Sequence, residues 1–286
     1  MSSPPRHLLK DLSLSAIAAG FVTVLVGFAS SAVIVFQAAQ SLGASPEEIS
    51  SWMWALGLGM GLTCIGLSLR YRMPVVTAWS TPGAAMLIGS VAGLPLSDAI
   101  GAFLMSALLI AASGFSGFFE RMISRIPASL ASGMLAGVLL RFGIDAFAAM
   151  ETQLGMVLTM FAVYLLARRL LPRYAVILTL LVGIAFAAGL GLLRVDGLSL
   201  QLAKPVFTTP TFSLAAIVGI ALPLFIVTMA SQNVPGVSVI RASGYAIPIS
   251  PVVGWTGLVN LLLAPFGAFA LNLAAITAAI CMGREA

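Results

Sequence analysis

Apolar residues occur in long runs along this chain, separated by short stretches that contain charges, proline or glycine. Most runs approach or exceed the roughly 20 residues that an α-helix needs to cross a bilayer. The pattern therefore predicts ten segments that lie in a membrane. In chain order they are Ser13–Gln40, Glu48–Leu69, Pro74–Val91, Ser97–Phe119, Pro127–Asp145, Glu151–Leu170, Tyr174–Leu192, Phe212–Ile240, Ile249–Ala264 and Pro265–Met282.

The third segment is predicted to be only half helical. Pro74–Trp79 begins with proline and contains β-branched residues, which favours extended chain. A helix start follows, with Thr81 as the expected N-cap and Pro82 at the first helical position. A helix of ten residues spans about 15 Å, half of a roughly 30 Å hydrocarbon core. The helix is therefore expected to begin near the membrane midplane.

The tenth segment repeats this plan. An extended stretch, Pro265–Leu271, precedes an expected N-cap at Asn272 and a ten-residue helix, Leu273–Met282. Phe28–Ser31 in the first segment also resembles Met229–Gln232 in the eighth. Seven spans lie between the start of one copy and the start of the other. Because seven is an odd number, the two copies are inverted relative to each other. We expect a first repeat over residues 1–206, with spans 1–7, and a partial second repeat over 207–286, with spans 8–10.

Composition supports a membrane protein. Hydrophobic residues make up 60% of the 286 positions and charged residues only 8%, whereas soluble domains average about 45–50% apolar and about 25% charged residues. The mean hydropathy is +1.10. The chain is therefore expected to be an all-α polytopic membrane protein. The net charge of +5 does not imply a nucleic-acid partner, because in such a protein the placement of the charges matters more than their sum.

The basic residues predict the orientation. If the N-terminus is cytoplasmic, 11 of the 14 basic residues fall in inside loops, as the positive-inside rule requires. We therefore expect a multi-pass protein of the bacterial inner membrane with a cytoplasmic N-terminus. The 11 residues are Arg6, Lys10, Arg70, Arg72, Arg121, Arg125, Arg168, Arg169, Arg173, Arg241 and Arg284.

Two cysteines and a single histidine, His7, are too few for a disulfide framework or a Cys/His metal site. The spans also contain no histidine, no paired carboxylates and no Ser/Lys pair on facing segments, so that an intramembrane enzyme is disfavoured. No metal or cofactor is expected. A scaffold without transport activity would not need two helices that begin at the midplane.

The two interrupted segments predict an anion site. Each helix N-terminus carries about half a positive charge and unpaired N–H groups, so that the point between Thr81 and Asn272 favours an anion without a charged side chain. The alternative is a pair of proline-kinked helices packed in a core. We favour the site, because interrupted spans at matching repeat positions are the best sequence indication of a transporter site.

Further polar and aromatic residues are candidates for the same site. Gln232 and Asn233 lie in an apolar run, where each either bonds the backbone freed by Pro235 or faces a cavity and binds substrate. Ser31 is a weaker candidate in the first span. Trp79 and Phe269 precede the two helix starts and can stack on a flat ring, although aromatic residues in spans more often pack against neighbours.

Three motifs carry a resemblance to a known family: Ala78–Ala85 after Arg70–Pro74, Ser231–Gly236, and Ala270–Ala274. They resemble the benzoate:proton symporter family (BenE), and the likeness covers the whole chain. That family is similar in architecture to nucleobase permeases and sulfate-permease-like anion carriers, which have seven-plus-seven inverted repeats. The resemblance implies a core domain of residues 1–120 plus 207–286 and a gate domain of residues 121–206.

The resemblance also implies the function. It predicts proton-coupled symport of benzoate or a related small aromatic carboxylate into the cytoplasm by alternating access, with the proton as the coupling ion. The site residues would be Thr81, Gly83, Gln232, Asn233 and Asn272. No carboxylate falls near the midplane of any span, so that no proton-coupling residue is visible, and a weakly acidic substrate can itself bring the proton. A homodimer is implied by analogy with relatives of this architecture.

The chain departs from the related families in two ways. It lacks a carboxylate on the eighth or tenth span, which disfavours a nucleobase such as uracil. It also has ten spans where fourteen are expected, so that we expect a fragment, truncated after span 10, that does not complete a transport cycle alone. An inorganic-anion (sulfate-like) or nucleobase carrier of the same fold stays the alternative.

Overall fold

The computed structural model describes residues 14–90, 94–123, 125, 140, 144, 146–171, 174–193 and 202–282. These residues are mostly helical. The helices of the first half are α2 (Leu14–Ser41), α3 (Pro46–Tyr71), α4 (Thr81–Ser90), α5 (Leu96–Phe115), α6 (Phe118–Ile123), α8 (Met150–Leu170) and α9 (Ala175–Gly189). The second half contains one long helix, described below, then α13 (Ile249–Leu263), the 3₁₀ turn η4 (Ala264–Phe266) and α14 (Ile276–Cys281). Two short strands complete the fold, β1 (Thr77–Trp79) and β2 (Leu271–Leu273).

Six of the described helices are long and apolar enough to cross a membrane. This confirms the prediction of a mostly helical polytopic membrane protein. The fifth predicted segment, Pro127–Asp145, lies almost entirely outside the described residues. The six helices are Ala16–Ser41, Pro46–Tyr71, Leu96–Phe115, Met150–Leu170, Leu214–Ala242 and Ile249–Phe266.

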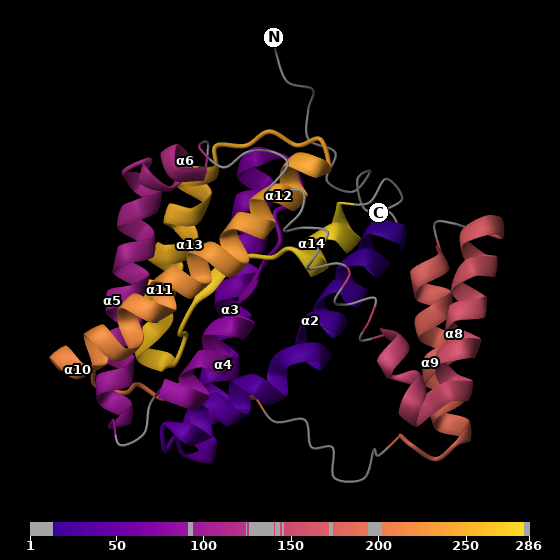
Figure 1. Ribbon diagram of the computed structural model, residues 1–286, viewed down its shortest axis with the longest axis horizontal. Coiled ribbons are helices and arrows are strands. Elements are labelled where there is room, and N and C mark those ends of the chain that lie inside the picture. Colours follow the sequence, from indigo (N-terminus) through magenta and orange to yellow (C-terminus); the bar gives the residue numbers. More distant parts are fainter. Residues whose placement is uncertain are drawn as a thin grey trace. The chain divides into compact units, whose positions relative to one another are not determined.

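Packing divides the chain into two compact units. The first comprises Met1–Val26, Gly137–Leu200 and Ile280–Ala286, and the second comprises Gly27–Ala136 and Gln201–Ala279. Within the first unit, α8 and α9 form a helical hairpin (Figure 1). They approach closely at Gly183, where a Cβ atom would lie 2.9 Å from Cε of Met160.

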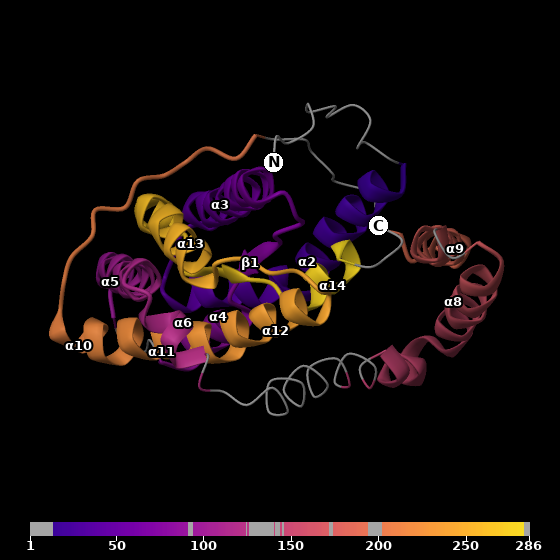
Figure 2. The ribbon, with the colours of Figure 1, turned by 90° about the horizontal axis from the view of Figure 1, so that it is seen from above.

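The second unit is built around the pair α5 and α13, which pack backbone against backbone. A Cβ atom on Gly257 of α13 would lie 2.5 Å from the backbone nitrogen of Ala111 on α5. One turn away, Gly114 of α5 faces the backbone of Gly254 in the same manner. From the first contact to the second, the position on α5 rises from 111 to 114 and the position on α13 falls from 257 to 254. The two helices are therefore antiparallel. Figure 2 shows α3, α5 and α13 nearly end-on, side by side.

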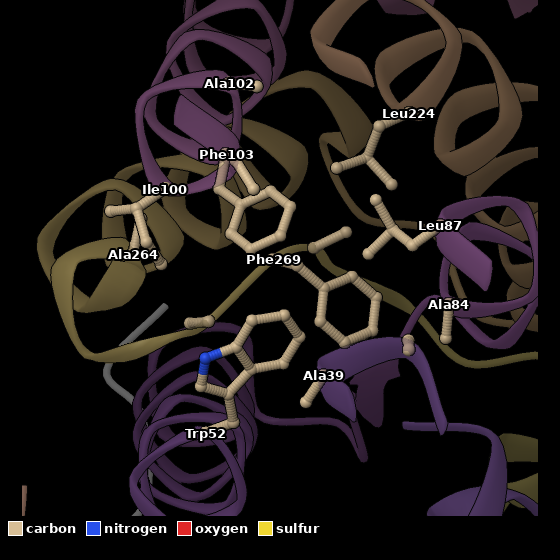
Figure 3. Packing of buried hydrophobic residues seen from close by; sticks show 14 of the residues in the cluster. Ala39, Trp52, Ala84, Leu87, Ile100, Ala102, Phe103, Leu224, Ala264 and Phe269 are labelled. Carbon is tan, nitrogen blue, oxygen red and sulfur yellow. The ribbon is translucent and has the colours of Figure 1, made fainter. Parts of the chain in front are cut away.

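Large apolar side chains fill the centre of this unit (Figure 3). Trp52 of α3, Phe103 of α5 and Phe269 are each at most 1% exposed and contact one another, with ring centroids 5.4–6.1 Å apart. Leu87 of α4 and Leu224 are fully buried beside them. Burying aromatic and aliphatic side chains of this size contributes about 1.5–3 kcal/mol each in water. This cluster joins segments that are far apart in the sequence.

The eighth span, predicted as Phe212–Ile240, is one long helix with two π-helical turns. It consists of α10 (Leu214–Ala216), η2 (Ile217–Ala221), α11 (Leu222–Thr228), η3 (Met229–Asn233) and α12 (Val234–Ala242). Pro223 and Pro235 each lie two residues after a π turn. Proline lacks an N–H and clashes with the carbonyl four residues earlier, and that carbonyl lies within the π turn in both cases. The wider turns thus keep the helix continuous through both prolines.

The structure corrects both predicted N-caps. Helix α4 begins at Thr81, and Ser80 rather than Thr81 caps it, because Gly83 N–H donates to Oγ of Ser80 over 3.1 Å. Asn272 caps no helix, since it lies in β2 and α14 begins only at Ile276. The cause is strand pairing: Ala274 N–H still donates to the carbonyl of Val76 over 2.9 Å, which holds the chain extended beyond the expected helix start.

The contact between α5 and α13 predicts a strong effect of Gly257→Val. The added side chain meets the backbone of Ala111, so that the helices must separate, and overpacking of this kind costs about 1–3 kcal/mol. The midpoint of thermal unfolding in detergent should fall. Gly61→Val is the matched control, because a Cβ atom on Gly61 meets nothing within 4 Å. Equal midpoints for the two variants would contradict the packing described here.

Candidate functional site

The third and tenth segments, which the sequence predicted to be interrupted, lie side by side and pair as antiparallel strands. Thr77 lies opposite Leu273, Ala78 opposite Asn272 and Trp79 opposite Leu271. Ser80 N–H also donates to the carbonyl of Ala270 over 3.1 Å. Inside a membrane an unpaired backbone group costs several kcal/mol, so that extended chain needs a partner at this depth. The sequence predicted the extended chain of both strands but not that each is the other's partner. The prediction was wrong for Pro265–Gly267, where η4 and a turn precede the extended chain.

Side chains from the flanking helices bond the outer edges of this two-stranded ribbon. On β1, Thr77 N–H donates to Sγ of Cys64 on α3 over 3.2 Å. On β2, Leu273 N–H donates to Oδ1 of Asn233 over 2.9 Å. The carbonyl of Phe269, just before β2, accepts from Nδ2 of Asn260 on α13 over 3.4 Å. Each strand therefore has bound backbone groups on both its inner and its outer edge.

Asn233 connects the eighth span to β2. The side chain is fully buried in the π turn η3, and its Nδ2 lies 3.2 Å from Sδ of Met229. Of the two expected roles, backbone bonding is the one observed, although the backbone belongs to Leu273 and not to the segment around Pro235. Gln232, the preceding residue, is partly exposed.

Trp79 is fixed against α2. Its Nε1–H donates to Oγ of Ser31 over 2.9 Å, and Ser31 in turn donates to the carbonyl of Gly27. The ring of Phe28 contacts the indole edge to face, with centroids 4.8 Å apart. Trp79 is 4% exposed. The structure therefore brings the two predicted site residues Ser31 and Trp79 together.

Phe269, the second aromatic candidate, lies in the apolar cluster. Its ring is fully buried against Trp52 and Phe103, and Figure 3 shows it in the centre of the packed side chains. No face of this ring is open for stacking on a substrate. Packing in the core, the commoner role of an aromatic residue in a span, is the one observed.

Some of the backbone N–H groups in the first turn of α4 are hydrogen-bonded within the protein. Pro82 has no N–H, and Gly83 N–H is bound by Ser80, so that these contacts leave the amide of Thr81 as the main first-turn donor. Gly83 is buried, and a Cβ atom there would lie 2.7 Å from Cδ1 of Leu224. Glycine at this position lets α4 pack closely against α11. Thr81 itself is partly exposed.

The side chain of Asn272 has no hydrogen-bond partner in the part of the chain that the structure describes. The residue is fully buried, and both Oδ1 and Nδ2 are unpaired. Leaving such groups unpaired costs about 1–3 kcal/mol for each group. A buried carboxamide whose oxygen and nitrogen are both unpaired, on one strand of a two-stranded ribbon, is suited to binding a polar ligand. Among the described residues no cluster of His, Cys, Asp or Glu could hold a metal ion.

Three residues that hold the ribbon were not identified from the sequence. They are Ser80, which caps α4, and Cys64 and Asn260, which bind the outer edges of the strands. Asn260 left a signal, since it is a lone carboxamide in the apolar run Ile249–Ala264. Cys64 left none, because cysteine is common in apolar segments for reasons of packing alone.

Apolar spans and two interrupted segments that cross in their interior define a polytopic membrane protein, and comparison with known proteins gives its family. Residues 10–286 match the family described as BenE, benzoate membrane transport protein. The chain therefore belongs to the benzoate membrane transport protein family. This is a transporter family, and the protein is not an enzyme.

Two relatives align with the entire chain. The inner membrane protein YdcO of Escherichia coli K12 is 47% identical over 285 residues, which are 71% of its own length. The benzoate membrane transport protein of Acinetobacter baylyi is 38% identical over 286 residues, or 73% of its length. The chain is accordingly an inner membrane protein with several candidate spans.

The bond between Asn233 and Leu273 predicts that Asn233→Ala destabilises the fold. The substitution leaves a buried N–H without an acceptor, which costs about 1–3 kcal/mol. Thermal unfolding in detergent, without substrate, should begin at a lower temperature than in the wild type. Gln232→Ala is the control on the adjacent, partly exposed residue, and its midpoint should stay within error of the wild type. If Asn233→Ala is as stable as this control, Asn233 does not hold β2.

Proposed function

We propose that this protein imports benzoate or a related aromatic carboxylate together with a proton, by alternating access. Membership of the benzoate membrane transport family supports this substrate class. The Acinetobacter relative carries benzoate transport in its name.

We further propose the seven-plus-seven inverted-repeat architecture, with the first repeat over residues 1–206 and the second beginning at 207. The antiparallel pairing of β1 with β2 supports this arrangement, because strands related by an inversion run in opposite directions. The core domain of residues 1–120 plus 207–286 and the gate domain of residues 121–206 are part of the same proposal. So are the cytoplasmic N-terminus and a homodimer.

The substrate site is proposed where the two strands cross. The observation that carries it is the fully buried carboxamide of Asn272, which has no partner at either end. Thr81 lies next to this crossing, at the start of α4, and Gln232 lies beside the Asn233 that binds β2. The N-terminal end of α4 adds a favourable potential for the carboxylate. Ser31, Trp79, Gly83 and Asn233 act in this proposal by fixing the strands and α4 in place.

Asn272→Leu separates a role in binding from a role in folding. Leucine has a similar volume and removes two unpaired polar atoms from a buried position, so that stability should be unchanged or higher. Uptake of labelled benzoate into proteoliposomes that contain the full-length transporter, driven by an inward proton gradient, should be lost.

The control is Gln37→Leu, which makes the same chemical change on an exposed residue of α2. It should leave uptake near the wild-type level. The proposed site is wrong if Asn272→Leu transports as well as this control. The proposed substrate or coupling is wrong if the wild type shows no gradient-driven benzoate uptake.

A further inference from the structure

The hydrogen-bonding capacity of Asn272 distinguishes between two forms of the substrate. Its carboxamide presents donors at Nδ2 and an acceptor at Oδ1, and both are unpaired. A carboxylate has acceptors only. It can accept from Nδ2, but its second oxygen then faces Oδ1, and two acceptors cannot form a hydrogen bond with each other. A protonated carboxyl group has one acceptor and one donor. It alone satisfies both ends of Asn272 with a pair of parallel hydrogen bonds.

We propose that the coupling proton is carried on the substrate's own carboxyl group, between a carboxyl oxygen and Oδ1 of Asn272. This inference rests on the proposed function and states where the coupling proton is held during transport. In the step itself, the carboxylate takes a proton from hydronium at the outer side, giving the acid and water. The acid O–H donates to Oδ1 of Asn272, and its carbonyl oxygen accepts from Nδ2. At the cytoplasmic side the acid dissociates and returns the proton to water.

The surroundings of the ribbon contain no better carrier for the proton in the described part of the chain. The elements that pack most closely against β2 are β1, α3, α13 and η3. Their titratable and charged groups are Glu47, Glu48, Cys64, Arg70 and Tyr71, all on α3. The helix meets the ribbon from Gly59 to Cys64. Glu48 therefore lies eleven residues before these contacts and Arg70 six residues after them, about 16 Å and about 9 Å away along the axis. Cys64 is already bonded to Thr77.

The same surroundings disfavour a buried anion. Three alanines lie next to Asn272 on its face of the ribbon. Ala78 is across from it, and Ala270 and Ala274 are two positions away along the chain, one residue beyond either end of β2. These methyl groups are small enough to sit beside a carboxyl group but offer it no charge. Without a cation, burial penalises the charged form of a carboxyl group and raises its pKa. A neutral acid is therefore the species that this position accepts at lowest cost.

The experiment compares ligands that differ in acidity but not in size. The pair is ortho-fluorobenzoate, the salt of a stronger acid, and para-fluorobenzoate, whose acidity is close to that of benzoate. Binding to the purified wild-type protein is measured by calorimetry between pH 5.5 and 7.5. The corresponding fluorobenzamides serve as controls, since they have the same shapes, remain neutral, and present an N–H donor beside a carbonyl acceptor.

A substrate-borne proton predicts three results. The Kd of each benzoate rises about tenfold per pH unit, because the acid fraction falls by that factor above the carboxyl pKa. The ortho isomer binds more weakly than the para isomer, in proportion to its acid fraction, after correction by the ratio of the two benzamides. The benzamides compete with benzoate, and their own Kd does not change with pH.

Other outcomes overturn the inference without affecting the proposed transport. A Kd that is independent of pH indicates that the anion binds. A pH-dependent Kd with equal corrected affinities for the two isomers indicates that a group on the protein carries the proton. Failure of the benzamides to compete excludes a neutral carboxyl at Asn272. Failure of every benzoate to bind at any pH would instead overturn both this inference and the proposed function.

Discussion

The structure depends on one constraint: two stretches of extended backbone in otherwise apolar segments must have all their polar groups bound. Lipid offers no hydrogen bonds, so that a lone extended segment in the membrane interior is unstable. Here the two stretches satisfy each other along their inner edges. Asn233, Asn260 and Cys64 satisfy groups on the outer edges. Neither strand can exist in this place without the other, although 191 residues separate Pro74 from Pro265 (265 − 74).

This constraint explains which parts of the site could be predicted. The first extended stretch follows from local chemistry, since a proline and β-branched residues precede the start of α4. The pairing does not follow from local chemistry, because it depends on which remote segment lies alongside. The predicted N-cap at Asn272 failed for the same reason. Asn272 has the intrinsic preference of an N-cap residue, but strand pairing through Ala274 delays the helix to Ile276.

The packing around the ribbon could likewise be predicted only in part. Apolar length alone identified the long helices, since the number of residues needed to cross a bilayer is fixed by helix geometry. The contact between Gly257 and Ala111 and the central position of Phe269 could not be assigned to particular partners, because every span is apolar around most of its circumference. Gln232 and Asn233 stood out as carboxamides in an apolar run. Only the structure distinguishes the one that binds backbone from the one that is partly exposed.

The bond from Leu273 to Asn233 has a mechanical consequence. The carboxamide belongs to a helix with two π turns, and the amide belongs to a strand that leads into α14. Any displacement of β2 along its own axis must either break this buried bond or draw the long helix with it. Breaking the bond leaves a buried N–H without an acceptor, which costs about 1–3 kcal/mol. The strand and the 29-residue helix Leu214–Ala242 are therefore mechanically coupled through the side chain of Asn233.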